Sequence, residues 1–250
     1  MTSNTTSGAD MSEETTIAAD AGKGCVTVLS ASAQRAALTR CAQDFQRKTG
    51  VGVHFEWATS GAVTDRIEAG ESFDAVAAAH SALQKLAQAS RLSPGIHIVG
   101  IARIALGMRK GETPPDISTP EKFREALLNA RSFSRGDPAG GGTAGNFLAA
   151  MLDRIGVLEA TREKSILRVG GYNVMREVAN GAADFGLTQS TEIVAVDGVE
   201  ISAWLPQELQ MDTVYAVTTG KTPVSPDAQA FLDFVTGPEG KEIYKRAGFA

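Results

Sequence analysis

Apolar and polar positions alternate along this chain in two rhythms, one typical of strands and one typical of helices. The run CVTVLS (25–30) is short and rich in β-branched residues, which predicts a strand. A helical pattern follows over 33–48 and ends at Gly50. The apolar stripe of this helix consists of Ala37, Leu38, Cys41 and Phe45.

The same alternation continues to the end of the chain. Further strands are predicted at 51–57, 73–79, 132–134, 165–169 and 184–188. Further helices are predicted at 60–70, 81–92, 120–130, 144–155, 172–180, 226–236 and 238–247. Strands that alternate with helices predict an α/β fold, in which helices cover both faces of parallel sheets.

Two extended segments interrupt the alternation, IHIVGIARIALGMR (96–109) and ELQMDTVYAVTTG (208–220). The first is too long for an ordinary strand, so it forms either two strands or one strand that leaves its domain. Two strand–helix series joined by such segments predict two lobes with two crossing strands between them. Lobe one would comprise 25–107 plus 213–250, and lobe two 108–212. The cleft between the lobes is the expected ligand site.

Residues 1–24 are polar, small and acidic, which predicts a disordered tail. The segment has neither the basic region nor the apolar run of a secretory signal. We therefore expect a cytoplasmic protein as the sequence stands, and a periplasmic one if a signal was lost or removed.

Composition narrows the possible partners. The net charge is −5 without a cluster of lysines and arginines, which argues against a nucleic-acid surface. No 18 apolar residues run together, so no membrane insertion is expected. The two cysteines and three histidines lack metal-ligand spacing, and we expect neither a metal nor a cofactor.

The stretch DPAGGGTAG (137–145) contains a G-x-G-x-x-G pattern. A dinucleotide fingerprint needs its strand immediately before the glycines and an acidic residue about 20 positions later. Here Asp137-Pro138-Ala139 intervenes, and the next predicted strand is followed by Gly170-Gly171. Asn146 follows the last glycine, which excludes a Walker A loop. Two readings remain, a small-anion site at a helix start and a structural turn.

Six stretches resemble one known family together and in the same order. They are VTVLSASAQ (26–34), FQRKTG (45–50), ATSGAVTDRIEAGESFDAV (58–76), DPAGGGTAG (137–145), NGAADFGLTQ (180–189) and AQAFLDFVTGPEGKEIYKRAGF (228–249). The chain from residue 26 to 250 thereby resembles the molybdate-type periplasmic solute-binding proteins.

The resemblance implies a type II periplasmic-binding-protein fold with an anion held between two lobes. Hydroxyls and helix-start amides, rather than charged side chains, would hold the anion. The lobe-one ligand groups would be Ser30 or Ser32, and Thr59 or Ser60. The lobe-two groups would be Thr143 with the amides of its neighbours Gly142, Ala144 and Gly145.

The chain departs from the family's pattern at three places. The family's first serine aligns nearest to Ala33, with Ser32 displaced by one position. Gln189 replaces the tyrosine that closes the family's site, and Gly170-Gly171-Tyr172 replaces an Asn-Val pair. We keep Tyr172 and Gln189 as candidate ligand residues. The elements PDISTP (115–120), DPAxGG and QSTE (189–192) are more similar to a sister branch that includes, further off, aconitate isomerase.

Two functions remain open, with an orphan regulator or sensor as a third. The first is a protein that binds a small oxyanion or carboxylate, with an ABC permease as its partner. The second is a cytoplasmic isomerase of small polycarboxylates. A carboxylate ligand favours bidentate arginine contacts, for which Arg103 and Arg135 are the candidates. An isomerase needs a base, for which Asp137 and Glu192 are the candidates.

Overall fold

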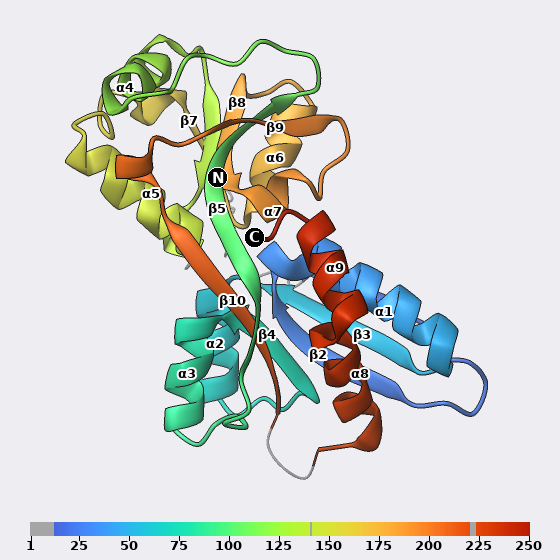
Figure 1. Cartoon of the computed structure of the whole chain (residues 1–250). Coiled ribbons are helices and arrows are strands. Elements are labelled where there is room, and N and C mark those ends of the chain that lie inside the picture. The colour runs from blue at the N-terminus through green and yellow to red at the C-terminus, as the bar shows by residue number, and fades with distance from the viewer. Residues whose placement is uncertain (1–12, 141, 221–223) are drawn as a thin grey trace, which may run out of the picture.

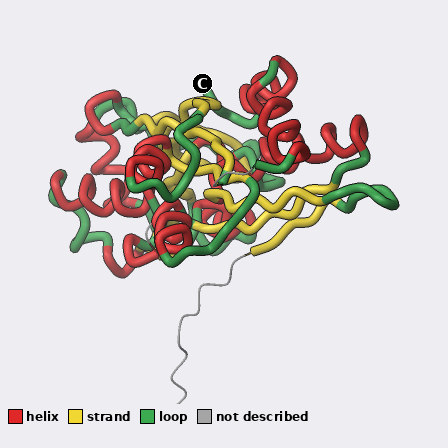
Figure 2. The backbone as a smooth tube through the Cα atoms, turned by 90° about the horizontal axis from the view of Figure 1, so that it is seen from below, coloured by secondary structure: helices red, strands yellow, loops and turns green. Residues whose placement is uncertain are grey.

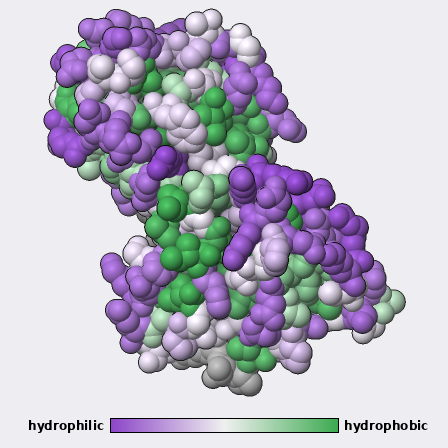
Figure 3. All heavy atoms as spheres, in the orientation of Figure 1, coloured by the Kyte–Doolittle hydropathy of each residue, from purple (hydrophilic) through white to green (hydrophobic). Residues whose placement is uncertain are grey.

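The fold is taken from a computed structural model, which describes residues 13–140, 142–220 and 224–250. Figure 1 shows two α/β lobes joined by two long strands, and the space-filling view in Figure 3 shows a narrow waist between them. Figure 2 shows the strands in the middle of the molecule with helices around them. The prediction of a two-lobed α/β fold is confirmed.

Lobe one is built on a mixed sheet in which three neighbouring strands run parallel. Its strands are β1 (Glu13–Ile17), β2 (Cys25–Ala31), β3 (Gly52–Ala58), β4 (Ala75–Ala79) and β10 (Asp212–Thr219). The sheet order is β1-β3-β2-β4-β10, with β1 and β10 antiparallel to their neighbours. Its helices are α1 (Arg35–Thr49), α2 (Ser60–Glu68), α3 (His80–Gln88), α8 (Pro226–Thr236) and α9 (Pro238–Arg246). Helices α1, α8 and α9 lie together on one side of the sheet, and α2 and α3 on the other.

Lobe two repeats this plan on a smaller sheet. Its strands are β6 (Phe133–Gly136), β7 (Ser165–Arg168), β8 (Phe185–Gln189) and β9 (Val199–Trp204). Its helices are α4 (Pro120–Asn129), α5 (Thr143–Arg154), α6 (Gly171–Ala179) and the short α7 (Ser190–Ile193). Four 3₁₀ turns complete the described elements, η1 (Ser32–Gln34), η2 (Pro138–Gly140), η3 (Arg162–Lys164) and η4 (Gln207–Leu209). Strands β6, β7 and β8 are parallel.

Strand β5 (His97–Arg109) belongs to both lobes. Its first half pairs with β10, up to the pair Arg103–Asp212. Its second half pairs with β8 on one side and β9 on the other. The expected segment 96–109 is thus one strand that leaves its domain, and the backbone ladder continues through it from one lobe to the other.

The hydrophobic cores show where the lobes divide. The lobe-one core extends along β5 to Ala102, and a lobe-two core begins at Ile104. The sequence placed this division later, after residue 107. Lobe two has a second core on its other face, formed by residues of α6, α7 and β9. Neither α7 nor β9 was predicted, because α7 has only four residues and β9 is largely half-buried.

The prediction of a disordered tail over 1–24 does not hold for residues 13–17, which form β1. This strand pairs antiparallel with β3 from Glu13–Trp57 to Ile17–Val53. The Thr15 hydroxyl accepts a hydrogen bond from the Trp57 indole at 2.9 Å. Without β1, β3 would be an edge strand with unpaired backbone groups. Backbone hydrogen bonds to β3, rather than burial of apolar side chains, hold β1 in place. Its side chains can therefore be polar, and the composition of the segment does not predict a strand. Residues 1–12 lie outside the described part of the chain.

The side chain of Gln210 takes the place of a strand partner where β5 crosses between the lobes. Its Oε1 accepts from the Ile104 amide at 2.9 Å, and its Nε2 donates to the Ile104 carbonyl at 3.0 Å. The substitution Gln210→Ala leaves both backbone groups without this partner. We expect it to lower the free energy of unfolding by about 1–3 kcal/mol, measured by urea denaturation. The exposed Gln207→Ala is the control, and equal effects of the two substitutions would contradict the assignment.

Candidate functional site

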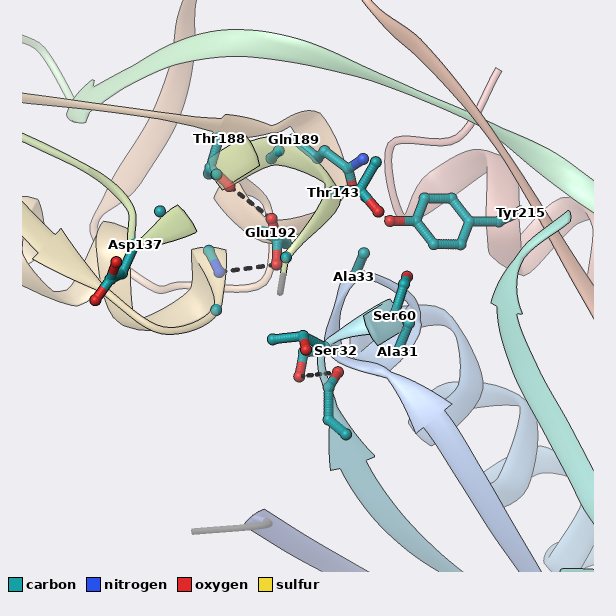
Figure 4. Close-up of a pocket in the computed structure, with 18 residues that line it drawn as sticks. Ala31, Ser32, Ala33, Ser60, Asp137, Thr143, Thr188, Gln189, Glu192 and Tyr215 are labelled. Carbon is teal, nitrogen blue, oxygen red and sulfur yellow. Dashed lines mark hydrogen bonds between the residues drawn. The ribbon is translucent and has the colours of Figure 1, made fainter. Parts of the chain in front are cut away.

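A pocket lies between the lobes, where the starts of several helices converge (Figure 4). We call it the interlobe pocket. Residues of β2, η1 and α2 line it from lobe one, and residues of α5, β8 and α7 from lobe two. It encloses about 40 Å³. A cavity for a single water needs about 10–15 Å³, so the pocket is small but larger than a water site.

Lobe one contributes hydroxyls at two helix starts. Ser32 begins η1, and its hydroxyl donates to the Ala58 carbonyl at 3.1 Å. Thr59 is the N-cap of α2, where its hydroxyl oxygen accepts from the Ala62 amide at 3.2 Å. Capping uses the oxygen of Thr59 and leaves its O–H available as a donor. Ser60, the first residue of α2, is 9% exposed and also lines the pocket.

Lobe two contributes the start of α5. The first intrahelical bond there runs from the Asn146 amide to the Gly142 carbonyl at 3.0 Å. The amides of Thr143, Ala144 and Gly145 therefore have no acceptor within the helix. These residues line the pocket together with the Thr143 side chain, which points into it in Figure 4. Free amides at the positive end of a helix dipole favour an anion.

The glycine loop also has a packing role. A Cβ on Gly136 would lie 2.8 Å from the Gly145 Cα, and a Cβ on Gly145 would lie 3.0 Å from the Gly136 carbonyl carbon. Both distances are too short for a side chain, so two glycines let α5 start directly against the end of β6. A Cβ on Gly142 would lie 3.9 Å from the Thr59 methyl group, in ordinary contact across the cleft. The two roles considered for the 137–145 loop, a structural turn and an anion site at a helix start, are therefore compatible.

Glu192 places a carboxyl group inside the interlobe pocket. It is 7% exposed, and its Oε1 accepts from the Gly171 amide at 2.9 Å. Its Oε2 accepts from the Thr188 hydroxyl at 2.6 Å. Burial raises the pKa of Glu192 above its ordinary value, against the lowering effects of these two bonds, the Gln189 backbone and the Arg35 charge. The start of α6 is thereby occupied by a group of the protein itself.

Gln189 and Tyr215 form a neutral chain of hydrogen bonds across the crossing strand. The Tyr215 hydroxyl donates to Gln189 Oε1 at 2.6 Å, and Gln189 Nε2 donates to the Thr213 hydroxyl at 2.9 Å. Burial, with the nearby Glu192 charge, raises the pKa of Tyr215, which keeps its phenol protonated. Both side chains line the pocket. Tyr215 therefore presents a fixed neutral group rather than a charge.

Arg35 connects the two lobes beside the pocket. Its guanidinium lies 5.2 Å from the ring centroid of Trp57 in lobe one and 5.2 Å from that of Tyr172 in lobe two. Such cation–π contacts are typically worth about 0.5–2 kcal/mol. Its charge also acts on Glu192. Tyr172 thus lies against Arg35 and is not among the residues that line the pocket.

Three further candidates from the sequence do not line the interlobe pocket. Ser30 is fully buried, and its hydroxyl donates to the Ala31 carbonyl at 3.1 Å. Arg103 is exposed on β5 and pairs with Asp212 of β10 at 3.0 Å, because strand pairing places the two residues opposite each other. Arg135 is 5% exposed within β6, and burial lowers its pKa. Of the atoms that the structure describes, none bonds to its Nε or Nη1.

The remaining sequence candidates do meet in the pocket. Ser32, Thr59 and Ser60 face the group Gly142, Thr143, Ala144 and Gly145, with Gln189 beside them. Asp137 also lines the pocket, but in Figure 4 its carboxylate points away from the other labelled side chains, and it accepts from the Ala139 amide at 3.0 Å. Sequence reasoning missed Thr188 and Tyr215 as pocket residues. Thr188 is the second-last residue of β8 and precedes Glu192 by four positions, and this short spacing is the signal that could have linked the two.

The described residues that line the pocket include two carboxyl groups and no lysine, arginine or histidine. Neutral donors therefore supply the attraction for an anion. Among the described residues, no group of three or more His, Cys, Asp or Glu side chains could hold a metal ion. No described helix combines the length and apolar character needed to cross a bilayer.

Comparison with known proteins identifies the family. The family model described as "Bacterial extracellular solute-binding protein" matches residues 26–250. The chain belongs to this family, and its two-lobed fold is the one expected from the resemblance of its motifs.

Two relatives and one solved structure are similar to the chain over most of its length. It is 26% identical over 230 residues to an aconitate isomerase of a Pseudomonas species, covering 89% of this chain and 86% of that protein. It is 25% identical over 233 residues to the molybdate-binding protein of Escherichia coli (strain K12), covering 92% and 90%. The periplasmic molybdate-binding protein of Azotobacter vinelandii superimposes with a TM-score of 0.74 at 21% identity, covering 90% of this chain and 98% of that one.

The raised pKa of Glu192 predicts how stability changes with pH. A carboxyl group whose pKa is higher in the folded state than in the unfolded state loses stability as the pH rises through that range. We expect Glu192→Gln and the wild type to be about equally stable near pH 4, where the carboxyl is largely protonated in both states. The variant should gain relative stability as the pH rises toward 8, measured by urea unfolding. The exposed Glu163→Gln should show no such gain. A variant that loses relative stability as the pH rises would show that the fold lowers this pKa.

Proposed function

We propose that the protein binds a small oxyanion or carboxylate in the interlobe pocket and serves as the solute receptor of an ABC transporter. The observation that carries the proposal is the convergence of helix-start amides and hydroxyls from both lobes on one pocket. Ser32, Thr59 and Ser60 supply one side, and the start of α5 at Thr143 supplies the other. The molybdate-binding relatives support an anion as the ligand.

The electrostatics of the pocket support a ligand held by neutral donors. Uncharged N–H and O–H groups bind the lone pairs of an anion without a buried lysine or arginine to be neutralised. Three amides at the start of α5 act together with the helix dipole. Because these donors lie on different lobes, an anion between them links the lobes and favours their approach.

The size of the pocket favours a small ligand. Its volume is about 40 Å³, against about 10–15 Å³ for a cavity that holds a single water. A tricarboxylate is larger and would require the lobes to move apart. A wider groove, lined in part by Ser60 and Thr143, lies next to the pocket and offers a route for the ligand.

An ABC permease is the partner that this function requires, and the family membership supports it. A transport receptor would act outside the cytoplasmic membrane, whereas an isomerase of metabolites would act in the cytoplasm. Location therefore stays a prediction, and cell fractionation with an antibody to the chain tests it.

A thermal-shift screen of oxyanions, monocarboxylates and polycarboxylates tests the proposal. A ligand that binds only the folded state adds about 2.7 kcal/mol of stability at a hundred times its Kd. For a protein of this size that corresponds to a rise in Tm of roughly 5–10 °C. A screen in which no anion raises the Tm would contradict the proposed function.

Thr143→Val tests whether the α5 start is the anion site. The substitution removes one hydroxyl at nearly constant volume. Loss of a hydrogen bond to a charged group costs roughly 1.5–3 kcal/mol, so affinity for the best anion of the screen should fall about tenfold to a hundredfold. Titration calorimetry measures the change, with the exposed Thr113→Val as the control. Unchanged affinity in a folded Thr143→Val protein would leave the loop as a structural turn.

A second candidate function is isomerisation of a small polycarboxylate, and Glu192 is the observation that favours it. A buried carboxyl group with a raised pKa in a ligand pocket is suited to take a proton from a bound substrate. The aconitate isomerase relative supports this candidate. We rank it second because the pocket is small and because Glu192 is already held by Thr188 and Gly171.

Proton NMR of incubated ligands separates the two functions. A receptor leaves cis- and trans-aconitate, and every anion found in the screen, chemically unchanged over hours. An isomerase interconverts the aconitate isomers, and Glu192→Gln removes that activity. Conversion by the wild type that is lost in Glu192→Gln would place the enzyme ahead of the receptor.

A further inference from the structure

The interlobe pocket contains one strong acceptor among its donors. Amides and hydroxyls face the ligand space. The amides belong to the start of α5, and the hydroxyls to Thr59, Ser60 and Thr143. Beside these donors lies the carboxyl group of Glu192, a side chain that is more than nine-tenths buried. Figure 4 shows its carboxyl group between Thr188 and the start of α6, facing Ser32 and Ser60 across the pocket.

The fold is shaped to hold this carboxyl group at the helix start. A Cβ on Gly171 would lie 2.0 Å from Glu192 Oε2 and 2.1 Å from the Thr188 hydroxyl oxygen. Only a glycine leaves room for these two groups. The Gly171 amide, which would otherwise be free to bind a ligand, donates to Glu192 Oε1 at 2.9 Å. The carboxyl group therefore occupies a position at which another helix start would bind an anion.

The Gly171 amide and the Thr188 hydroxyl each donate to one carboxylate oxygen of Glu192, and the Gln189 backbone acts on the same carboxyl group. A carboxylate has about four lone-pair sites, so acceptor capacity remains toward the pocket. A ligand oxygen that has only lone pairs repels such an acceptor. A ligand O–H group can donate to it instead and relieves the repulsion between like charges.

The charged and titratable neighbours of Glu192 do not remove the repulsion between its carboxylate and a ligand oxygen. Arg35, on the α1 side, acts on Glu192 through space and is stacked between Trp57 and Tyr172. Tyr215, on β10, donates its proton to Gln189. The carboxylate of Asp137 points away from Glu192 in Figure 4 and accepts from the Ala139 amide. When Glu192 is ionised, the ligand must therefore supply the hydrogen that its carboxylate accepts.

We propose that Glu192 is a specificity-determining residue, which selects small anions that present an O–H group and excludes fully ionised oxyanions. The inference rests on the proposed anion-binding function of the same pocket. The shared chemistry of the selected ligands is one negative group for the amides and hydroxyls and one O–H donor for Glu192. A protonated oxyanion such as hydrogen phosphate and a small hydroxycarboxylate such as glycolate both carry it.

Two matched pairs of anions test the proposal by titration calorimetry on the full chain at about pH 8, where carboxylates are favoured. Hydrogen phosphate is compared with sulfate, and glycolate with acetate. The wild type should prefer the O–H member of at least one pair by about tenfold or more, because a site built for a hydroxyl rejects the analogue that lacks it. The pair that shows the preference tells whether the donor is an acid proton or an alcohol.

The variant Glu192→Gln keeps the size of the side chain and replaces one acceptor oxygen with an N–H donor. We expect each preference to fall to near unity, mainly through tighter binding of sulfate or acetate. Glu163→Gln changes the net charge equally on the exposed surface and should keep the wild-type ratios. Thermal unfolding of each variant verifies that it is folded.

The outcomes separate this inference from the function on which it rests. Tight sulfate or acetate binding without a preference for hydrogen phosphate or glycolate overturns the role of Glu192 and leaves the anion-binding function standing. Ratios that stay the same in Glu192→Gln overturn it as well. Binding of none of the four anions, nor of any anion in the thermal-shift screen, overturns both.

Discussion

Backbone hydrogen bonding along β5 ties the two lobes into one molecule. The strand completes the lobe-one ladder beside β10 and then enters the lobe-two ladder between β8 and β9. At the change of partners, Gln210 pairs with both backbone groups of Ile104. This continuity sets how the helix starts of the two lobes face each other, so the geometry of the interlobe pocket depends on it.

Within the pocket, the balance of charge defines the kind of ligand. Amides and hydroxyls attract an anion, while the carboxyl group of Glu192 opposes a high negative charge. Arg35 offsets part of this opposition from outside the pocket and joins the lobes through Trp57 and Tyr172. The site therefore combines hydrogen-bond donors with a carboxyl group, within a fold that is shared with a molybdate-binding protein.

Glycine determines the detailed form of this site at two helix starts. Gly136 and Gly145 let α5 begin against β6, which directs the free amides of α5 into the cleft. Gly171 admits the carboxyl group of Glu192 to the start of α6. One helix start is thereby open to a ligand, and the other is filled by the protein.

The sequence alone determined the α/β class, most element positions and the two lobes, and the resemblance of its motifs added the candidates Ser30 or Ser32, Thr59 or Ser60, and the 142–145 loop. These features follow from local periodicity, capping and motif order, which neighbouring residues specify. Tertiary structure alone decided that Arg103 pairs with Asp212, that Ser30 and Arg135 are buried, and that Tyr172 lies on Arg35. It also brought Thr188 and Tyr215 to the pocket beside Glu192, and it paired β1 with an open sheet edge. Such contacts join residues far apart in the chain, and strand register and helix packing fix them in ways that no local pattern encodes.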